Sequence, residues 1–122
     1  MDLEYSKKLM DILIDNASRI LNANFGVDRA ESTFIDIIDL LREDQSLADQ
    51  PLKAYFLAKV RKTLEGPDPY GLDEGSVPME LIQLAVHELR WPEFRALSQK
   101  RRILEAYDDH WMNREFYRRY RA

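Results

Sequence analysis

The chain has 122 residues, no cysteine and a formal net charge of −4 at pH 7, and this length fits one domain with a single core. The absence of cysteine excludes disulfides, thiol catalysis and thiolate metal sites, and the acidic balance argues against broad, non-specific binding of nucleic acid. No apolar run approaches the roughly 20 residues that cross a membrane, and the first residues lack the apolar core of a signal peptide, so we expect a cytoplasmic protein.

The first helix is expected over residues 2–22. Apolar residues recur there every three or four positions, which places them on one side of a helix. Glu4 with Lys8 and Asp15 with Arg19 are oppositely charged pairs four residues apart, in the order that supports a helix. The apolar side consists of Leu3, Leu9, Met10, Leu13, Ile14, Ala17, Ile20 and Leu21.

The second helix is expected to open at Asp28, because an N-cap residue followed three positions later by Glu31 forms a capping box. Its apolar stripe consists of Ala30, Phe34, Ile37, Ile38 and Leu41. The third helix should begin near Pro51, a favoured residue of the first turn, and end before Gly66-Pro67. Its buried side is predicted to hold Leu52, Phe56, Val60 and Leu64.

The central helix is predicted at residues 78–90, after a long loop at residues 66–77. Apolar residues cover more than half of its circumference, which indicates a helix that packs against several neighbours. We expect Leu81, Ile82, Ala85 and Leu89 to be among the most buried residues of the protein.

Trp91-Pro92 is predicted to bend the chain sharply, because proline removes a helical hydrogen bond and restricts the residue before it. Trp91 should be at least partly buried. A fifth helix then follows, with a break expected near Ser98, and a last helix is expected from about residue 110. The segments predict an all-α fold, a single-domain irregular bundle of five to six helices over residues 1–122.

The two histidines give little support for a metal site. His87 is predicted on the polar, half-exposed side of its helix, and the second histidine position of a zinc-binding HExxH motif holds Trp91. His110 follows two aspartates, but adjacent residues of a helix diverge by about 100°, so Asp108 or Asp109 is better suited to capping the last helix. We predict no bound metal and no cofactor.

Catalytic residues are not predicted either. No nucleophile is paired with a base by spacing, and the sequence has no G-x-S-x-G motif or glycine-rich phosphate loop. A carboxylate-dependent enzyme of unknown class, with its acids in or beside residues 66–77, stays an alternative that requires a pocket.

An acidic surface is predicted on the second helix. Asp36, Asp39 and Glu43 lie within about 60° of one another on the solvent side, with the apolar Ile35 on the same flank. This surface could attract a basic partner and use Ile35 as a buried anchor. An ordinary solvated helix face is the simpler interpretation.

A basic and aromatic surface is predicted at the C-terminal end. In a helix over residues 110–121, Arg114 and Arg118 lie opposite the apolar side and are flanked by Trp111. Arginine and aromatic residues are enriched at protein interfaces and also stack on exposed nucleic-acid bases. Ion pairs between these arginines and the acidic body of the protein explain the pattern equally well.

The leading hypothesis is a non-catalytic protein-binding module with a basic partner, for example a small acidic immunity-type protein that masks a basic toxin. A nucleic-acid-associated regulator that uses the C-terminal arginines is the first alternative, and the carboxylate-dependent enzyme is the second. The sequence does not predict the oligomeric state.

Overall fold

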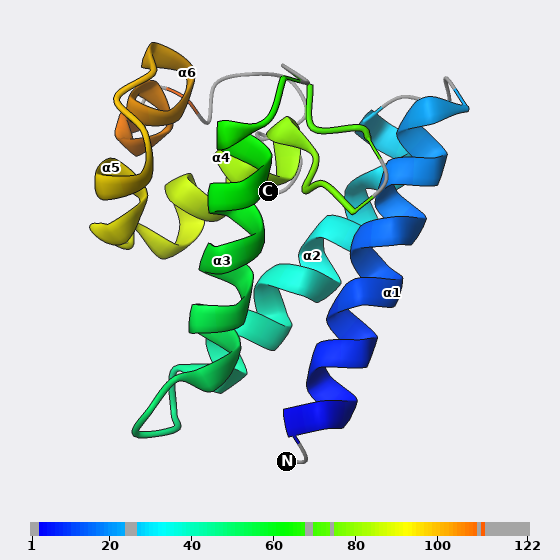
Figure 1. The fold of residues 1–122 in the computed structure, drawn as a ribbon, viewed down its shortest axis with the longest axis vertical. Coiled ribbons are helices and arrows are strands. Elements are labelled where there is room, and N and C mark those ends of the chain that lie inside the picture. Colours follow the sequence, from blue (N-terminus) through cyan, green and yellow to red (C-terminus); the bar gives the residue numbers. More distant parts are fainter. Residues whose placement is uncertain (1–2, 24–26, 68–69, 74, 110, 112–122) are drawn as a thin grey trace.

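Six α-helices and one short 3₁₀ helix make up the structure, a computed structural model that describes residues 3–23, 27–67, 70–73, 75–109 and 111 (Figure 1). The helices are α1 (Leu3–Asn22), α2 (Val27–Asp44), α3 (Pro51–Glu65), α4 (Met79–Leu89), α5 (Glu93–Leu97), α6 (Arg101–Leu104) and the 3₁₀ helix η1 (Glu105–Tyr107). The described residues contain no strand, which confirms the predicted all-α bundle.

The two longest helices, α1 and α2, pack against each other, and α3 contacts both (Figure 1). Every residue of the predicted apolar stripe of α2 is buried: Ala30, Phe34, Ile37, Ile38 and Leu41. The start of α2 differs from the prediction, because Val27 is already helical and Asp28 therefore does not occupy the N-cap position. The beginning of α3 at Pro51 and its end before Gly66 are confirmed.

Helix α4 is the central helix, as predicted. It contacts α2 and also α6 and η1, and residues 81–87 are buried without interruption. Leu89 is only half-buried, so its place among the most buried residues was predicted wrongly. Helix α4 ends at Leu89 and Arg90 adopts the left-handed conformation, so Leu89 lies at the edge of the core.

The end of α2 caps the beginning of α3. Both oxygens of the buried Asp44 carboxylate accept backbone N–H groups, from Leu52 at 3.0 Å and from Lys53 at 2.9 Å. Such N–H groups at the start of a helix have no partner within the helix, and a carboxylate there also interacts favourably with the helix dipole. Asp44 therefore joins α2 to α3 and determines the direction in which α3 starts.

Replacing Asp44 with alanine is expected to lower the free energy of unfolding by about 1–3 kcal/mol, since two N–H groups lose their acceptor in a buried place. Urea denaturation followed by circular dichroism measures this change. Asp49→Ala is the matched control, because Asp49 is exposed in the same α2–α3 connection. Equal stabilities of the two variants would contradict the capping role.

Candidate functional site

The acidic residues predicted on α2 are exposed. Asp36, Asp39 and Glu43 all face solvent, and α2 contains six acidic residues against two basic ones. Arg42 is a weak counter-ion for this cluster, because it lies 3.8 Å from Asp39 and is bound at 3.0 Å to Glu88 of α4. The cluster therefore keeps its negative character.

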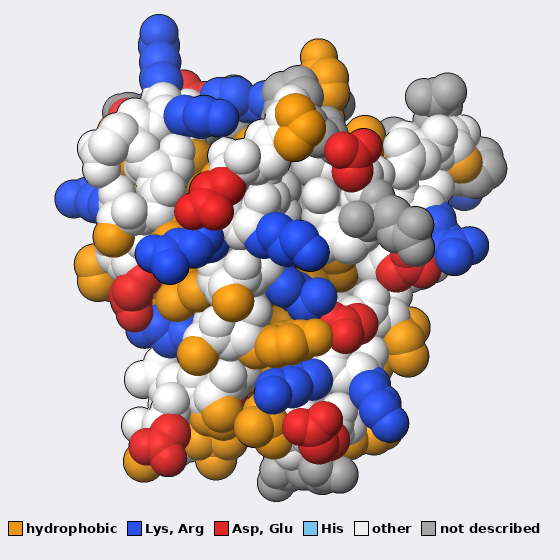
Figure 2. Space-filling model, in the orientation of Figure 1, with side chains coloured by type: hydrophobic (Ala, Val, Ile, Leu, Met, Phe, Trp, Pro, Cys, Tyr) orange, Lys and Arg blue, Asp and Glu red, His pale blue; other side chains and the backbone are white. Residues whose placement is uncertain are grey.

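The opposite charge is concentrated on α3, which has four basic residues and one acidic residue. Figure 2 shows the face on which α3 lies in front, and lysine and arginine side chains run along it. Acidic side chains lie between them on this face (Figure 2), and Lys53 and Lys59 are paired with Glu93 and Asp11. The unbalanced negative charge is therefore found on α2.

The packing of α1 on α2 places apolar side chains next to the acidic residues. Leu9 and Leu13 of α1 are half-buried and line a hollow of about 290 Å³. Asn16 of α1 donates a hydrogen bond to Thr33 of α2 at 3.3 Å and joins the two helices along this line. The hollow, termed here the α1–α2 groove, is lined by Leu9, Leu13, Asp36, Asp39, Leu40 and Glu43.

A second hollow of about 330 Å³ lies where α2 turns into α3. The two hollows share Leu40 and Glu43 in their linings, so they are neighbours on the surface. The second one, termed the end hollow, is also lined by Leu3, Ser6, Asp44, Ser46, Leu47, Pro51 and Leu52. Apolar and polar side chains thus both contribute to its walls.

Two large apolar side chains of α1 are exposed beside the groove. Tyr5 is 63% exposed and Ile12 is 65% exposed. They are four and three residues from Leu9, and residues at these spacings are neighbours on a helix surface. The apolar surface next to the acidic cluster therefore extends from the groove onto the outer side of α1.

Ile35 is half-buried and does not line the groove. It lies four residues before Asp39, so it remains a neighbour of that carboxylate on the other flank of the acidic cluster. It shares a flank of α2 with Arg42, seven residues later, whose guanidinium reaches Glu88 of α4. The apolar residues beside the acids come from α1, and the sequence pattern assigned them to the core.

Trp111 is also placed differently from the prediction. It is buried, and its ring centroid lies 5.0 Å from that of His87, so it does not present an accessible binding surface. Arg114 and Arg118 lie outside the described residues, as do His110 and the rest of the last predicted helix. The structure therefore leaves the C-terminal surface untested.

His87 was predicted on a half-exposed surface, and this was wrong. The side chain is 2% exposed, and its Nδ1 lies 2.9 Å from the carbonyl oxygen of Ala106. Gln83 of α4 and Arg90, which follows α4, likewise donate to backbone carbonyls, at Arg102 and Tyr107. The polar side of α4 is therefore covered by residues 101–109 and Trp111.

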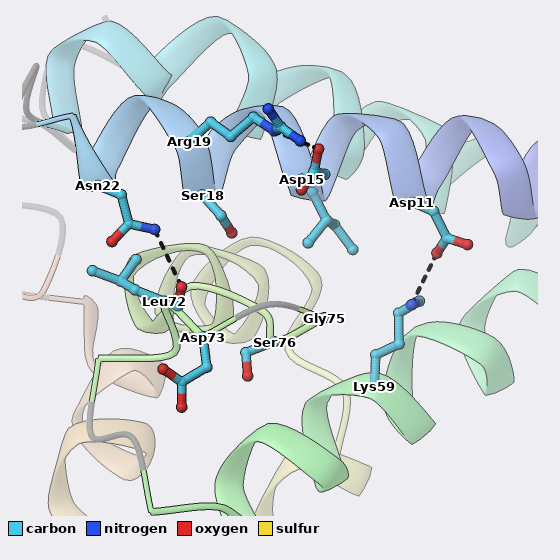
Figure 3. Close-up of a pocket in the computed structure, with 11 residues that line it drawn as sticks. Asp11, Asp15, Ser18, Arg19, Asn22, Lys59, Leu72, Asp73, Gly75 and Ser76 are labelled. Atoms are coloured by element: carbon cyan, nitrogen blue, oxygen red, sulfur yellow. Dashed lines mark hydrogen bonds and ion pairs between the residues drawn. The ribbon is translucent and has the colours of Figure 1, made fainter.

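A polar cleft of about 570 Å³ lies between α1, α3 and the loop residues Leu72, Asp73, Gly75 and Ser76 (Figure 3). Asp11 accepts hydrogen bonds from Tyr55 and binds the Lys59 ammonium at 2.9 Å. Burial lowers the pKa of Lys59, but the hydrogen bond and charge of Asp11 raise that pKa by more, so it lies above 10.5. Asp11 and Lys59 thus stabilise each other across the cleft.

Two further contacts are made at this cleft. Asp15 binds Arg19 at 2.8 Å, and Asn22 donates to the carbonyl oxygen of Leu72 at 3.2 Å (Figure 3). None of the described residues that line the cleft is a histidine or a cysteine. Asp11, Asp15 and Asp73 do line it, so the cleft supplies the pocket that a carboxylate-dependent enzyme requires, and this hypothesis stays untested.

The comparisons do not decide between these interpretations. No known family model, curated protein or solved structure matches the chain. Within the part of the chain that the structure describes, no three histidine or acidic side chains are grouped so that they could hold a metal ion. No helix among the same residues is both long and apolar enough to span a membrane.

Proposed function

We propose that the protein is a non-catalytic binding module that takes a basic, amphipathic segment of a partner protein into the α1–α2 groove. The observation that supports this proposal is an apolar floor from Leu9, Leu13 and Leu40 beside three exposed carboxylates. An amphipathic helix that binds such a groove buries its apolar side chains and keeps its charged ones at the rim.

The two parts of the groove have different tasks in this proposal. Asp36, Asp39 and Glu43 attract a lysine- or arginine-rich segment and accelerate the encounter. Leu9 and Leu13 then hold the segment by burying apolar area, which slows dissociation. A small acidic protein with this surface would neutralise a basic partner, and a cytoplasmic setting belongs to the same proposal.

A synthetic helical peptide with leucine on one face and lysine on the other is the probe for this function. We expect it to bind the full chain saturably and more weakly as the salt concentration rises, since the rim charges are screened. Asp36→Lys/Asp39→Lys should reduce the affinity at low salt by at least tenfold. Isothermal titration calorimetry measures both effects.

Glu65→Lys/Asp73→Lys is the matched control. It changes the net charge by the same amount, and both residues are exposed outside the groove. Equal losses of affinity in the two double variants would show attraction by overall charge alone and would contradict the proposal. If the chain binds the peptide and also binds a nucleic acid tightly, the C-terminal arginines Arg114 and Arg118 become the candidates for nucleic-acid binding.

A further inference from the structure

We propose that the α1–α2 groove is covered by the chain's own C-terminal segment, residues 112–122, when no partner is bound. The inference rests on the proposed function, because it names the occupant that a partner segment must displace from the same groove. It starts from the composition of this segment, which is opposite in charge to the wall of the groove and carries regularly spaced apolar residues.

The charges of the segment and of the groove are complementary. Residues 112–122 hold four arginines and one glutamate, whereas α2 holds six acidic residues and two basic ones. Asp36, Asp39 and Glu43 are exposed along the groove and form its negative wall. A positive segment that belongs to the same molecule is attracted to this wall, because its arginines stay close to the carboxylates at all times.

The apolar residues of the segment match the floor of the groove. Met112, Phe116 and Tyr120 recur every four positions, so a helix that this segment formed on binding would carry them on one face. Leu9 and Leu13 are half-buried and line the groove, so they retain apolar area that such a face can bury. Amphipathic helices bind apolar grooves through anchors of this kind. The segment thus supplies both the charges and the anchors that the groove requires.

The last described residue lies close enough for the segment to reach the groove. Trp111 is buried, and its ring centroid lies 5.0 Å from that of His87 in α4. The next residue of α4, Glu88, binds Arg42 of α2 at 3.0 Å, and Arg42 lies 3.8 Å from Asp39 in the wall of the groove. A short series of side-chain contacts therefore connects Trp111 with the groove, and an extended chain as long as residues 112–122 spans roughly 36 Å.

The covalent connection makes a weak contact sufficient. A segment that is joined to its binding site by a short stretch of chain acts at an effective concentration on the order of millimolar. A partner binds only the molecules whose groove is free, so its apparent dissociation constant is divided by the free fraction. With the segment in the groove of about three quarters of the molecules, a partner binds about fourfold more weakly. The C-terminal segment thus sets a threshold that a partner must exceed.

A spin label at the end of the chain tests where the segment lies. The chain has no cysteine, so Ala122→Cys provides a single attachment point for a nitroxide. The label should broaden the amide resonances of Leu13 and Asp39 in the groove and leave those of Ala54 and Ala58, exposed on α3, unchanged. Added salt should weaken the broadening, since it screens the charges. Broadening in a mixture of spin-labelled chains and separate isotopically labelled chains would place the segment in a second copy and overturn the proposal.

Competition with the basic amphipathic peptide tests the consequence for binding. Arg118→Glu/Arg119→Glu in the full chain should release the segment from the groove. The matched control is Arg61→Glu/Lys62→Glu, which changes the net charge by the same amount at two adjacent residues exposed on α3 outside the groove. Calorimetry should give a peptide affinity about three- to fivefold higher for the C-terminal variant than for the control. Equal affinities of the two variants, or a spin label that leaves the groove resonances sharp, would overturn the inference.

The failure of this inference can be told apart from the failure of the proposed function. Peptide binding to the groove without broadening by the spin label would overturn the C-terminal segment as the occupant and keep the proposed function. Broadening at the groove, with no peptide binding to the parent or to the C-terminal variant, would keep the contact of the segment and overturn the proposed function.

Discussion

Replacing Trp91 with alanine is expected to lower the free energy of unfolding by about 3–5 kcal/mol. Trp91 lies two residues after the end of α4, and its ring stacks on Phe94 of α5 at a centroid distance of 5.5 Å. It also meets Phe56 of α3 edge-on at 6.4 Å, and the Lys53 ammonium lies 4.9 Å from its ring. Its removal therefore leaves a cavity where α3, α4 and α5 meet.

The matched control for this prediction is Trp91→Phe. The indole N–H of Trp91 is buried without a hydrogen-bond partner among the described residues, so phenylalanine keeps much of the apolar area and removes an unsatisfied donor. Its loss of stability should be less than half that of the alanine variant. Urea unfolding monitored by far-UV circular dichroism measures both variants, and an alanine variant as stable as the parent would contradict the role of this joint.

The second large effect is expected in the α1–α2 groove. Leu9→Ala/Leu13→Ala should accelerate dissociation of the basic amphipathic peptide by tenfold or more, because a buried anchor acts mainly on the dissociation rate and is worth about 1–3 kcal/mol. Asp36→Lys/Asp39→Lys should instead slow association, most strongly at low salt. Stopped-flow fluorescence with a labelled peptide separates the two rates.

Ile35→Ala provides the control for the leucine variant. Ile35 is apolar and half-buried like Leu9 and Leu13, but it does not line the groove. The peptide should therefore dissociate from the Ile35→Ala variant at a rate within about twofold of that from the parent, the range of a near-neutral contact. A larger increase with Ile35→Ala than with the leucine variant would move the binding surface to the other flank of α2. Urea unfolding of each variant verifies that the fold is intact.

The positions of the helices follow from the sequence alone, because they depend on interactions between residues close in the chain. Proline is favoured in the first turn of a helix, so α3 begins at Pro51 as predicted. Pro92 disfavours a helix that continues through Trp91, so α4 ends before this pair as predicted. The buried side of α2 was equally readable, since a period of 3.6 residues defines one apolar face. The exposure of Asp36, Asp39 and Glu43 followed from the same geometry.

The surroundings of those faces were decided only by tertiary structure. A helical period tells in which direction a side chain leaves its helix, but not which distant segment meets it there. His87 was therefore expected at the surface, although Ala106 and Trp111 contact it in the interior. Leu9 and Leu13 were assigned to the core, although the crossing of α1 over α2 leaves them half-buried beside the acids of α2. The same holds for Asp44, whose capping role arises because the end of α2 and the start of α3 come together only in the folded chain.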